Sequence, residues 1–255
     1  MRDHGVQVRT RADPGSPVWD LMPTAASLDL GGQLDLRAIV FDLDGVIVDS
    51  HAVMCEAFSL AYAEVVGDGP VPFEEYTRHL GRYFPDIMRI MGLPLEMEEP
   101  FVRESYRLSR KVVLFDGVRE LLGALRARGL RLAVATGKSG PRARALLAEL
   151  RILDQFEQVI GSDEVAHPKP APDIVLRALD LLGVEPGGAM MIGDAVTDIQ
   201  SARGAGVRAV AALWAATDEA ALLAAGPDWV LPTPGALLGL LGGAAPLVDQ
   251  PHASA

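Results

Sequence analysis

Cysteine is nearly absent from this chain of 255 residues, in which Cys55 is the single thiol. One thiol can form neither an internal disulfide nor a cysteine-based zinc site, so the sequence excludes a disulfide-stapled scaffold. We therefore expect a cytoplasmic location rather than an oxidising compartment.

Positive charge is also scarce, because 34 acidic side chains face 23 lysine and arginine side chains and the formal net charge is -11. This balance disfavours binding to nucleic acid or to an anionic membrane through bulk charge. No apolar run reaches the roughly 18–20 residues of a membrane span, and residues 1–20 lack the apolar stretch of a signal peptide. We expect neither nucleic acid nor a membrane among the partners.

The chain does contain enough apolar material for a large buried core. Hydrophobic residues make up 49% of it and charged residues 22%, a globular composition that excludes disorder over the whole length. A chain of this size forms one large domain, or one domain that carries a smaller insert.

Short apolar runs recur along the chain, and they end at polar or glycine-containing turns. They predict buried strands at residues 36–41, 130–135, 158–161, 189–192, 207–213 and 228–231. Helical patterns lie between them at residues 118–128, 142–150, 172–182 and 197–205. Strands that alternate with helices predict an α/β fold, in which helices cover both faces of a parallel sheet.

One stretch breaks this alternation. Residues 51–113 contain several helical segments and no clear strand, so we expect a helical cap domain inserted into a core formed by residues 35–50 and 114–241. The hinges are expected near Ser50 and Leu114. Residues 1–34 are interpreted as an irregular arm and residues 242–255 as a frayed tail.

The end of the first predicted strand carries two carboxylates. Asp42 and Asp44 stand two residues apart, directly before Gly45. Two carboxylates after a buried strand are costly unless a cation neutralises them, and Mg²⁺ prefers oxygen ligands. The alternative interpretation is an aspartate turn that caps the following helix.

A second acidic pair follows the predicted strand at 189–192. Asp194 and Asp198 stand four residues apart. Because ligands of parallel α/β sheets bind beyond the carboxyl ends of the strands, this pair is expected near the first one, where it could complete a metal site. Alternatively, both are helix N-terminal carboxylates that the helix dipole favours.

Two further residues suit phosphate binding. Thr136 ends a predicted strand and stands before Gly137, so a hydroxyl lies beside exposed backbone N–H groups. Alternatively, Thr136 caps a helix. Lys169 is flanked by two prolines, whose rigid backbone would hold its charge near the acidic cluster and a phosphate. Alternatively, it is a solvated surface lysine.

The order of these clusters resembles the four motifs of the haloacid dehalogenase (HAD) superfamily of phosphohydrolases. The matching segments are VFDLDGVIVDS (40–50), VATGK (134–138), HPKPAPD (167–173) and IGDAVTD (192–198). The resemblance extends over residues 36–240 and implies a Rossmann-like core. The helical segment after the first motif resembles the C1-type cap of the phosphoglycolate phosphatase and β-phosphoglucomutase branch.

The resemblance implies a role for each acidic residue. Asp42 would be the nucleophile that forms an aspartyl-phosphate, and Asp44 would protonate the leaving oxygen and then activate water. Mg²⁺ would be held by the Asp42 carboxylate, the backbone carbonyl of Asp44 and the carboxylate of Asp194. Asp198 would stand behind them or act as an occasional ligand.

The same resemblance implies a phosphoryl site. Thr136 and the amide of Gly137 would hold the transferring group, while Lys169 would stabilise the negative charge that phosphate shares with Asp42. The second aspartate of the first motif, Asp44, argues against the dehalogenase branch, which lacks it and needs no metal.

The cap is expected to choose the substrate, because the core motifs contact only the phosphoryl group. Residues 79–86 (HLGRYFPD) resemble the cap loop that faces the active site in this branch. Arg82 would reach a phosphate or hydroxyl of the substrate, and Tyr83 would stack or hydrogen-bond; packing between cap helices is the alternative for Tyr83 and Phe84. His51 either lines the cleft or lies on the hinge surface.

A narrower resemblance concerns residues 61–76 and 79–94. They are similar to HAD phosphatases found with the synthesis of 3-amino-5-hydroxybenzoate (AHBA) in ansamycin-type antibiotic pathways, which implies a phosphorylated amino sugar or a related substrate. Residues 115–117 (FDG) depart from the branch, which often has proline before this glycine. The departure bears on the hinge and leaves the chemistry untouched.

We therefore predict a Mg²⁺-dependent phosphomonoesterase for a small phosphorylated metabolite, such as a sugar, amino-sugar or glycolate phosphate, working as a monomer or homodimer. A sugar phosphomutase of the same fold and a non-catalytic phospho-binding regulatory module are the alternatives. Gly193 stands where sugar phosphomutases often carry glutamate, and receiver domains are shorter and lack a helical insert, so both alternatives are disfavoured.

Overall fold

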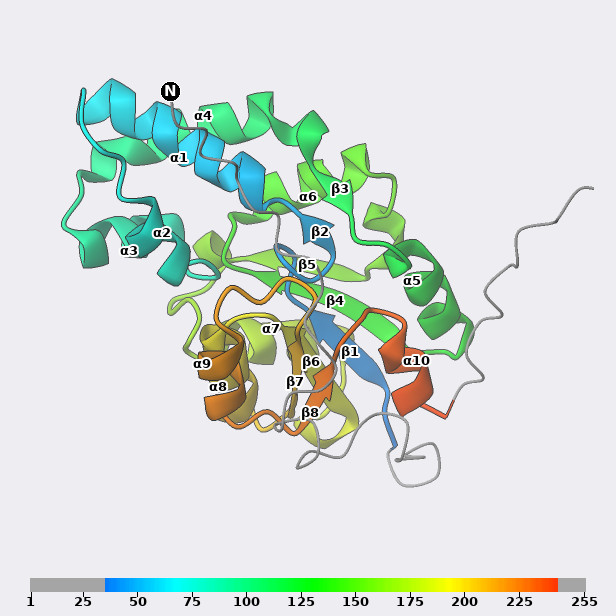
Figure 1. The fold of residues 1–255 in the computed structure, drawn as a ribbon. Coiled ribbons are helices and arrows are strands. Elements are labelled where there is room, and N and C mark those ends of the chain that lie inside the picture. The colour runs from blue at the N-terminus through cyan, green and yellow to red at the C-terminus, as the bar shows by residue number, and fades with distance from the viewer. Residues whose placement is uncertain (1–34, 243–255) are drawn as a thin grey trace, which may run out of the picture.

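A six-stranded parallel sheet forms the centre of the protein in its computed structural model, which describes residues 35–242 (Figure 1). The strand order is β5-β4-β1-β6-β7-β8. The strands are β1 (Ala38–Phe41), β4 (Arg131–Thr136), β5 (Gln158–Gly161), β6 (Ala189–Gly193), β7 (Arg208–Ala212) and β8 (Trp229–Leu231). The six predicted strands and the parallel α/β fold are confirmed. The arm predicted at residues 1–34, and all of the predicted tail except residue 242, lie outside the described residues.

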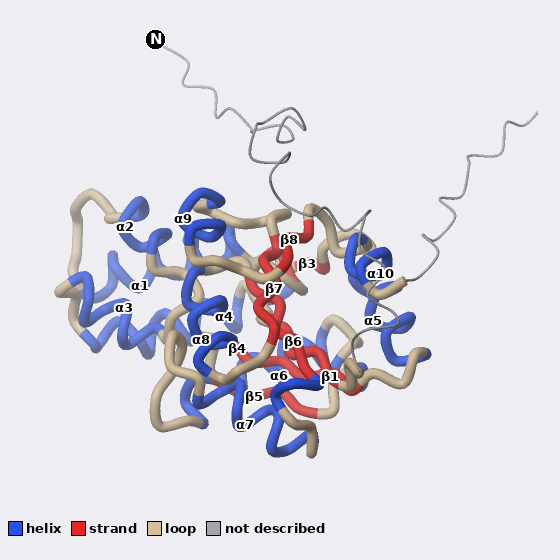
Figure 2. The backbone as a smooth tube through the Cα atoms, turned by 90° about the horizontal axis from the view of Figure 1, so that it is seen from below, coloured by secondary structure: helices blue, strands red, loops and turns tan. Residues whose placement is uncertain are grey.

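The two faces of the sheet are covered by different helices, because alternate residues of each strand point to opposite faces. Ala38 and Val40 of β1 belong to the hydrophobic cluster on one face, and Ile39 and Phe41 to the cluster on the other. The first face packs against α7 (Asp173–Leu182), α8 (Val196–Gly204) and α9 (Glu219–Ala224). The second packs against α5 (Val118–Ala127), α6 (Gly140–Glu149) and α10 (Ala236–Leu240). Figure 2 shows the strands running between these helices.

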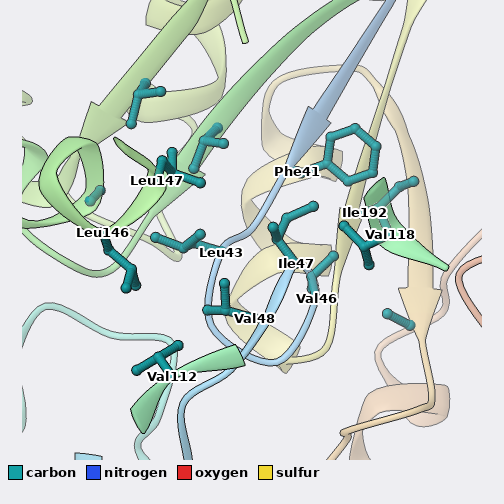
Figure 3. Close-up of a cluster of buried hydrophobic side chains, with 14 of the residues drawn as sticks. Phe41, Leu43, Val46, Ile47, Val48, Val112, Val118, Leu146, Leu147 and Ile192 are labelled. Carbon is teal, nitrogen blue, oxygen red and sulfur yellow. The ribbon is translucent and has the colours of Figure 1, made fainter. Parts of the chain in front are cut away.

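The second cluster continues from the sheet into the segment that follows β1. Figure 3 shows Phe41 of β1 and Ile192 of β6 together with Leu43, Ile47 and further side chains of the loop after β1. All of these side chains are at most 1% exposed. The loop that carries Asp42 and Asp44 is therefore anchored by apolar residues on the same face as α5 and α6.

A helical insert, residues 51–112, follows β1 and β2 in the sequence and precedes the rest of the core. Its helices are α1 (His51–Val65), α2 (Phe73–Arg78), α3 (Phe84–Met91) and α4 (Glu98–Arg107), so the several helical segments predicted within residues 51–113 are confirmed. Helix α1 packs against α4, and the insert lies to one side of the sheet (Figure 1). The insert also contains the short 3-10 helices η1 (Leu95–Met97) and η2 (Ser109–Lys111). The core contains η3 (Leu153–Gln155), η4 (Ser162–Glu164) and η5 (Pro186–Gly188).

Both connections to the insert run side by side in a two-stranded antiparallel ribbon that the sequence pattern did not predict. Val48 of β2 (Val48–Asp49) pairs with Leu114 of β3 (Val113–Leu114), and Asp49 pairs with Val113. The N–H of Phe115 extends the ribbon by donating to the carbonyl of Ile47 at 3.1 Å. Strands of two residues are too short to show an alternating period, so they leave no readable pattern. Within residues 35–242, no helix combines the length and the apolar character needed to cross a membrane.

Candidate active site

Lys169 lies in the interior of the site and joins two of the predicted acidic residues. Its ammonium donates to Oδ1 of Asp42 at 2.7 Å, to Oδ1 of Asp198 at 2.6 Å and to the carbonyl of Ala135 at 3.2 Å. The Lys169 and Asp198 side chains are fully buried, and Asp42 is 1% exposed. A buried charge is tolerated when paired and hydrogen-bonded, and here three acceptors use the three N–H bonds of the ammonium. The interpretation of Lys169 as a surface lysine is wrong.

Opposing effects set the charges of this buried pair. Burial alone lowers the pKa of Lys169, but Asp198 and Asp42 outweigh it and raise that pKa above its usual value, so Lys169 stays an ammonium. Burial raises the pKa of Asp42 to about 7, with Lys169 opposing and the negative charge of Asp198 adding to the rise. The site therefore holds more negative charge than one lysine compensates.

Three carboxylates are close enough to share a cation. Asp42, Asp194 and Asp198 each offer one oxygen, and these oxygens lie within 4.8 Å of one another. Burial, followed by the charges of Asp42 and Asp198, raises the pKa of Asp194 well above its usual value. An all-oxygen donor set with excess negative charge fits a hard divalent ion such as Mg²⁺.

Asp198 is the least available of the three carboxylates for binding a cation. One of its oxygens accepts from Lys169, and the other accepts from the backbone N–H of Ala195 at 3.0 Å, at the start of α8. It therefore fits the interpretation as a helix N-terminal carboxylate, and it also pairs with the buried lysine. In this arrangement Asp42 and Asp194 are the carboxylates better placed to bind a metal.

Asp44 is held by two residues whose roles the sequence analysis missed. The hydroxyl of Ser50 donates to its Oδ1 at 2.5 Å, and the ammonium of Lys138 lies 3.2 Å from its Oδ2. Burial raises the pKa of Asp44, yet Lys138 and Ser50 together outweigh it and lower the pKa below its usual value. Both residues belong to the segments that carry the first two motifs, so their place in those motifs was the available signal. Helix α1 begins after Ser50, so Asp44 is not its cap.

Gly45 brings the two acidic loops together. Its φ of 84° is a left-handed conformation that favours glycine. A Cβ at this position would overlap the carboxylate of Asp194. The glycine after the first acidic pair thus lets the loop after β1 approach the loop after β6 closely enough to build one site.

Thr136 and Gly137 lie at the end of β4, beneath a loop of the helical insert. Oγ1 of Thr136 accepts from the backbone N–H of Lys138 at 3.2 Å, while α6 is capped at Ser139, so Thr136 does not cap a helix. A Cβ on Gly137 would stand 2.5 Å from the carbonyl oxygen of Gly81 and 2.8 Å from that of Arg82. The insert therefore packs directly on the predicted phosphoryl site.

A single cavity brings most of the predicted residues together. The cavity has a volume of about 80 Å³, which suits a small ligand. Predicted residues in its lining are Asp42, Asp44, His51, Arg82, Thr136, Gly137 and Asp194. Asp198 and Lys169 are buried behind this lining. Tyr83 is not among the lining residues; its hydroxyl donates to Glu98 at 3.4 Å, whereas Phe84 lines the cavity.

The cavity also contains polar residues that sequence reasoning did not single out. Tyr76 of α2 and Arg142 of α6 line it, together with Phe101 of α4. Arg142 is 7% exposed and lies one helical turn before the buried Leu146, on the apolar face of α6. An arginine on the apolar face of an amphipathic helix was the signal that could have identified it.

The chain is similar in sequence to known hydrolases and phosphatases. Residues 36–206 match the family of haloacid dehalogenase-like hydrolases. A relative from Dickeya dadantii (strain 3937), named "Probable phosphatase IndB", is 34% identical over 208 residues, which cover 76% of this chain and 89% of that relative. A phosphoglycolate phosphatase of Rhodospirillum rubrum is 34% identical over 191 residues, covering 68% and 78%.

Solved structures share the fold. The crystal structure of a hydrolase from Pseudomonas syringae superposes with a TM-score of 0.72 at 24% identity, over 81% of this chain and 98% of that one. At this identity the match shows the fold alone. It agrees with the α/β core and its parallel sheet.

Proposed function

We propose a specific reaction from the premise that this chain belongs to the haloacid dehalogenase-like hydrolase family and is a phosphoric monoester hydrolase. The reaction is Mg²⁺-dependent hydrolysis of a small phosphomonoester through an aspartyl-phosphate on Asp42. The observation that carries the proposal is the position of Lys169, bonded to Asp42 and Asp198 beside Asp194. It provides a buried nucleophile, a fixed positive charge and a metal-ligand set in one place.

In the first half of the reaction, the Asp42 oxygen not bonded to Lys169 attacks phosphorus and the bond to the leaving alcohol breaks. Lys169 stabilises the negative charge shared by the carboxylate and the phosphoryl group, while Thr136 and the Gly137 amide hold that group. When bound to Asp42, Asp194 and the backbone carbonyl of Asp44, Mg²⁺ would neutralise charge on the phosphoryl oxygens.

Asp44 serves proton transfer in this proposal. Asp44 enters the first step as the carboxylic acid and gives its proton to the leaving oxygen, and the resulting carboxylate then accepts a proton from the water that hydrolyses the aspartyl-phosphate. Its contacts with Lys138 and Ser50 favour the ionised form that the second step needs. The two steps return Asp42 and Asp44 to their starting states.

The helical insert, residues 51–113, acts in this proposal as a cap that moves against the core formed by residues 35–50 and 114–241. Its two connections meet in the β2–β3 ribbon, where a hinge would lie. Gly81 and Arg82 already pack on Gly137 in the structure, and this closed arrangement would exclude water from the reacting groups. Arg82 and His51 would then face the substrate from the insert.

The substrate proposal covers small phosphate esters. Relatives named phosphoglycolate phosphatase support a glycolate-like ester, while the resemblance to phosphatases of AHBA synthesis supports an amino-sugar phosphate. A cytoplasmic location belongs to the proposal on the strength of the single cysteine. A phosphomutase is disfavoured, because a Cβ at Gly193 would overlap Asp198 and the position has no room for a longer side chain.

Phosphate release tests the proposal. The purified protein is assayed with Mg²⁺, and again with a chelator, on glycolate, sugar and amino-sugar phosphates. We expect metal-dependent turnover that disappears in Asp42→Asn while the variant keeps its fold by circular dichroism. Wild-type turnover in Asp42→Asn would overturn the nucleophile assignment. An isomerised product without phosphate release would instead identify a mutase.

A further inference from the structure

A second cavity adjoins the active-site cavity and is much larger. Its volume is about 630 Å³, against about 80 Å³ for the active-site cavity. It lies between α2 of the insert and the first residues of α8 and α9, which Figures 1 and 2 show on the same side of the molecule. Leu80, Arg82 and Asp194 line both cavities. A molecule whose phosphoryl group lies at the acidic cluster can therefore extend past Asp194 into the second cavity.

Thr197 presents a buried hydroxyl to the second cavity. It is the second residue of α8, lines this cavity and is 5% exposed. Among the described residues, no group forms a hydrogen bond with its Oγ1. A hydroxyl offers one donor and two acceptor positions, and leaving it unpaired inside a protein is destabilising. A hydroxyl group of a ligand in the second cavity would supply the missing partner.

Thr217 is held at the junction of the two cavities. It belongs to the loop between β7 and α9 and lines both cavities. Before it in the loop, Nε1 of Trp214 donates to the carbonyl of Val46 at 3.2 Å. After it, the carboxylate of Asp218 accepts from the backbone N–H of Ala221 at 2.9 Å. Because the loop is fixed on both sides, Thr217 can bind a ligand without a large loss of backbone entropy.

The charged side chains of the second cavity are paired or lie at its junction with the active site. Glu74 and Arg78 of α2 form an ion pair at 2.6 Å, and Asp218 caps α9. The other two, Arg82 and Asp194, also line the active-site cavity. Hydroxyl groups and apolar surface remain for a ligand that extends further, and they suit an uncharged, hydroxylated group.

We propose that the hydroxyls of Thr197 and Thr217 form hydrogen bonds with the alcohol part of the substrate, so that the catalytic core itself selects for an uncharged, polyhydroxylated alcohol longer than two carbons. This inference rests on the proposed phosphatase function and deepens it. It departs from the expectation that the insert chooses the substrate, because both threonines belong to the core. A two-carbon alcohol such as glycolate leaves most of the second cavity unfilled.

Two phosphate esters of equal chain length test the inference: erythritol 4-phosphate, which is polyhydroxylated, and n-butyl phosphate, which has no hydroxyl. We expect the wild type to prefer the hydroxylated ester by about 30-fold in kcat/KM, the scale of two hydrogen bonds. Thr197→Val, which is nearly isosteric, should reduce this preference by about tenfold and leave butyl phosphate within about threefold. Thr217→Val should reduce it by about threefold, because Thr217 is exposed.

Thr77 provides a matched control. It lines the same cavity, but its hydroxyl donates to the carbonyl of Phe73 at 2.7 Å, so Thr77→Val should leave the preference unchanged. If Thr197→Val slows both esters equally, Thr197 supports the fold and the inference fails. A wild type that prefers 2-phosphoglycolate to erythritol 4-phosphate would also overturn it.

Binding provides a readout that does not depend on turnover. Calorimetry with Asp42→Asn and Mg²⁺ should show tighter binding of erythritol 4-phosphate than of butyl phosphate. Adding Thr197→Ser, which keeps a hydroxyl, should retain the difference, and adding Thr197→Val should reduce it. Equal affinities for the two esters in Asp42→Asn would overturn the inference.

The proposed function is judged separately from this inference. It fails if the wild-type protein releases phosphate from no ester. It stands, and the inference alone fails, if the wild type hydrolyses erythritol 4-phosphate and butyl phosphate with equal efficiency.

Discussion

The two ends of the cavity satisfy their polar groups in different ways. At the core end, Lys169 has three acceptors, and its carboxylate partners Asp42 and Asp198 are buried with it. At the other end, Arg142 and Tyr76 are buried with a donor left unpaired on each. The polar groups of the core end are therefore satisfied within the chain, whereas those of the other end are not.

This difference follows from where the residues come from. The core end is built from the carboxyl ends of β1, β4 and β6, whose positions the sheet fixes. The other end combines α6 of the core with α2 and α4 of the insert. A rigid sheet suits chemistry that needs fixed distances, and a joint between two bodies suits recognition that follows closure.

Breaking the core end should produce the largest effect. Lys169→Met leaves the carboxylates of Asp42 and Asp198 buried without their cation, so we expect kcat to fall by about 1,000-fold or more and unfolding to become easier by about 3 kcal/mol. Phosphate release and chemical denaturation measure the two effects. Lys111→Met, which removes an exposed partner of Glu56, is the control, and equal losses in the two variants would contradict the assignment.

Separating the two ends should cost less. Gly137→Ala places a Cβ against the carbonyls of Gly81 and Arg82, so the insert must shift away from the core. We expect kcat/KM to fall by about 10- to 100-fold, because small displacements of positioning groups reduce turnover strongly. Gly123→Ala in α5, where a Cβ meets nothing within 4 Å, should instead leave turnover unchanged and stabilise the helix slightly. Full activity in Gly137→Ala would show that this contact is dispensable.

The charge of the core end should make metal binding depend on pH. Without a cation, the folded pKa of Asp42 is about 7, above the 3.8 of an ordinary aspartate, so its contribution to stability falls as pH rises through this window. Mg²⁺ offsets that loss when Asp42 is ionised. We expect the increase in Tm on adding Mg²⁺ to be larger at pH 8 than at pH 5.5, and to be small in Asp194→Asn. A Tm increase that does not change with pH would contradict this account.

The smallest expected effect concerns Asp44. Ser50→Ala removes the hydroxyl that donates to its ionised form, so the pKa of Asp44 should rise. If ionised Asp44 activates water, the acidic limb of the pH profile of kcat should move to higher pH. Ser59→Ala is the control, because Ser59 lies on α1, which begins after Ser50, and its hydroxyl donates to the carbonyl of Cys55. This variant should leave the pH profile unchanged. An unchanged profile in Ser50→Ala would show that Ser50 does not set the pKa of Asp44.

The core end could be read from the sequence because its residues follow strands. Buried apolar runs that stop at Asp42, Thr136 and Asp194 predict both the strands and their shared edge. The pairing of β2 with β3 could not be read, because two-residue strands have no period. Neither could the short helices α9 and α10, which have few residues to show a pattern.

The end of the cavity that contains Tyr76 and Arg142 was hidden for a different reason. Tyr76 and Arg142 are far apart in the sequence and meet through packing between separate helices, which no local period encodes. Tyr83 shows the reverse case, since its place in the cap loop suggested substrate contact while its hydroxyl bonds to Glu98 instead. The direction of a side chain within a loop depends on its tertiary contacts, which the spacing of residues in the sequence does not determine.

The β2–β3 ribbon has a consequence for how this architecture can diversify. The chain leaves the core and returns to it at the paired strands β2 and β3. The whole insert is therefore one long loop whose two ends lie side by side. The entropy of closing such a loop grows only with the logarithm of its length, about 0.6 kcal/mol for each doubling. Lineages can therefore lengthen, shorten or exchange the insert at little thermodynamic cost, and alter what is recognised while the catalytic edge of the sheet is inherited intact.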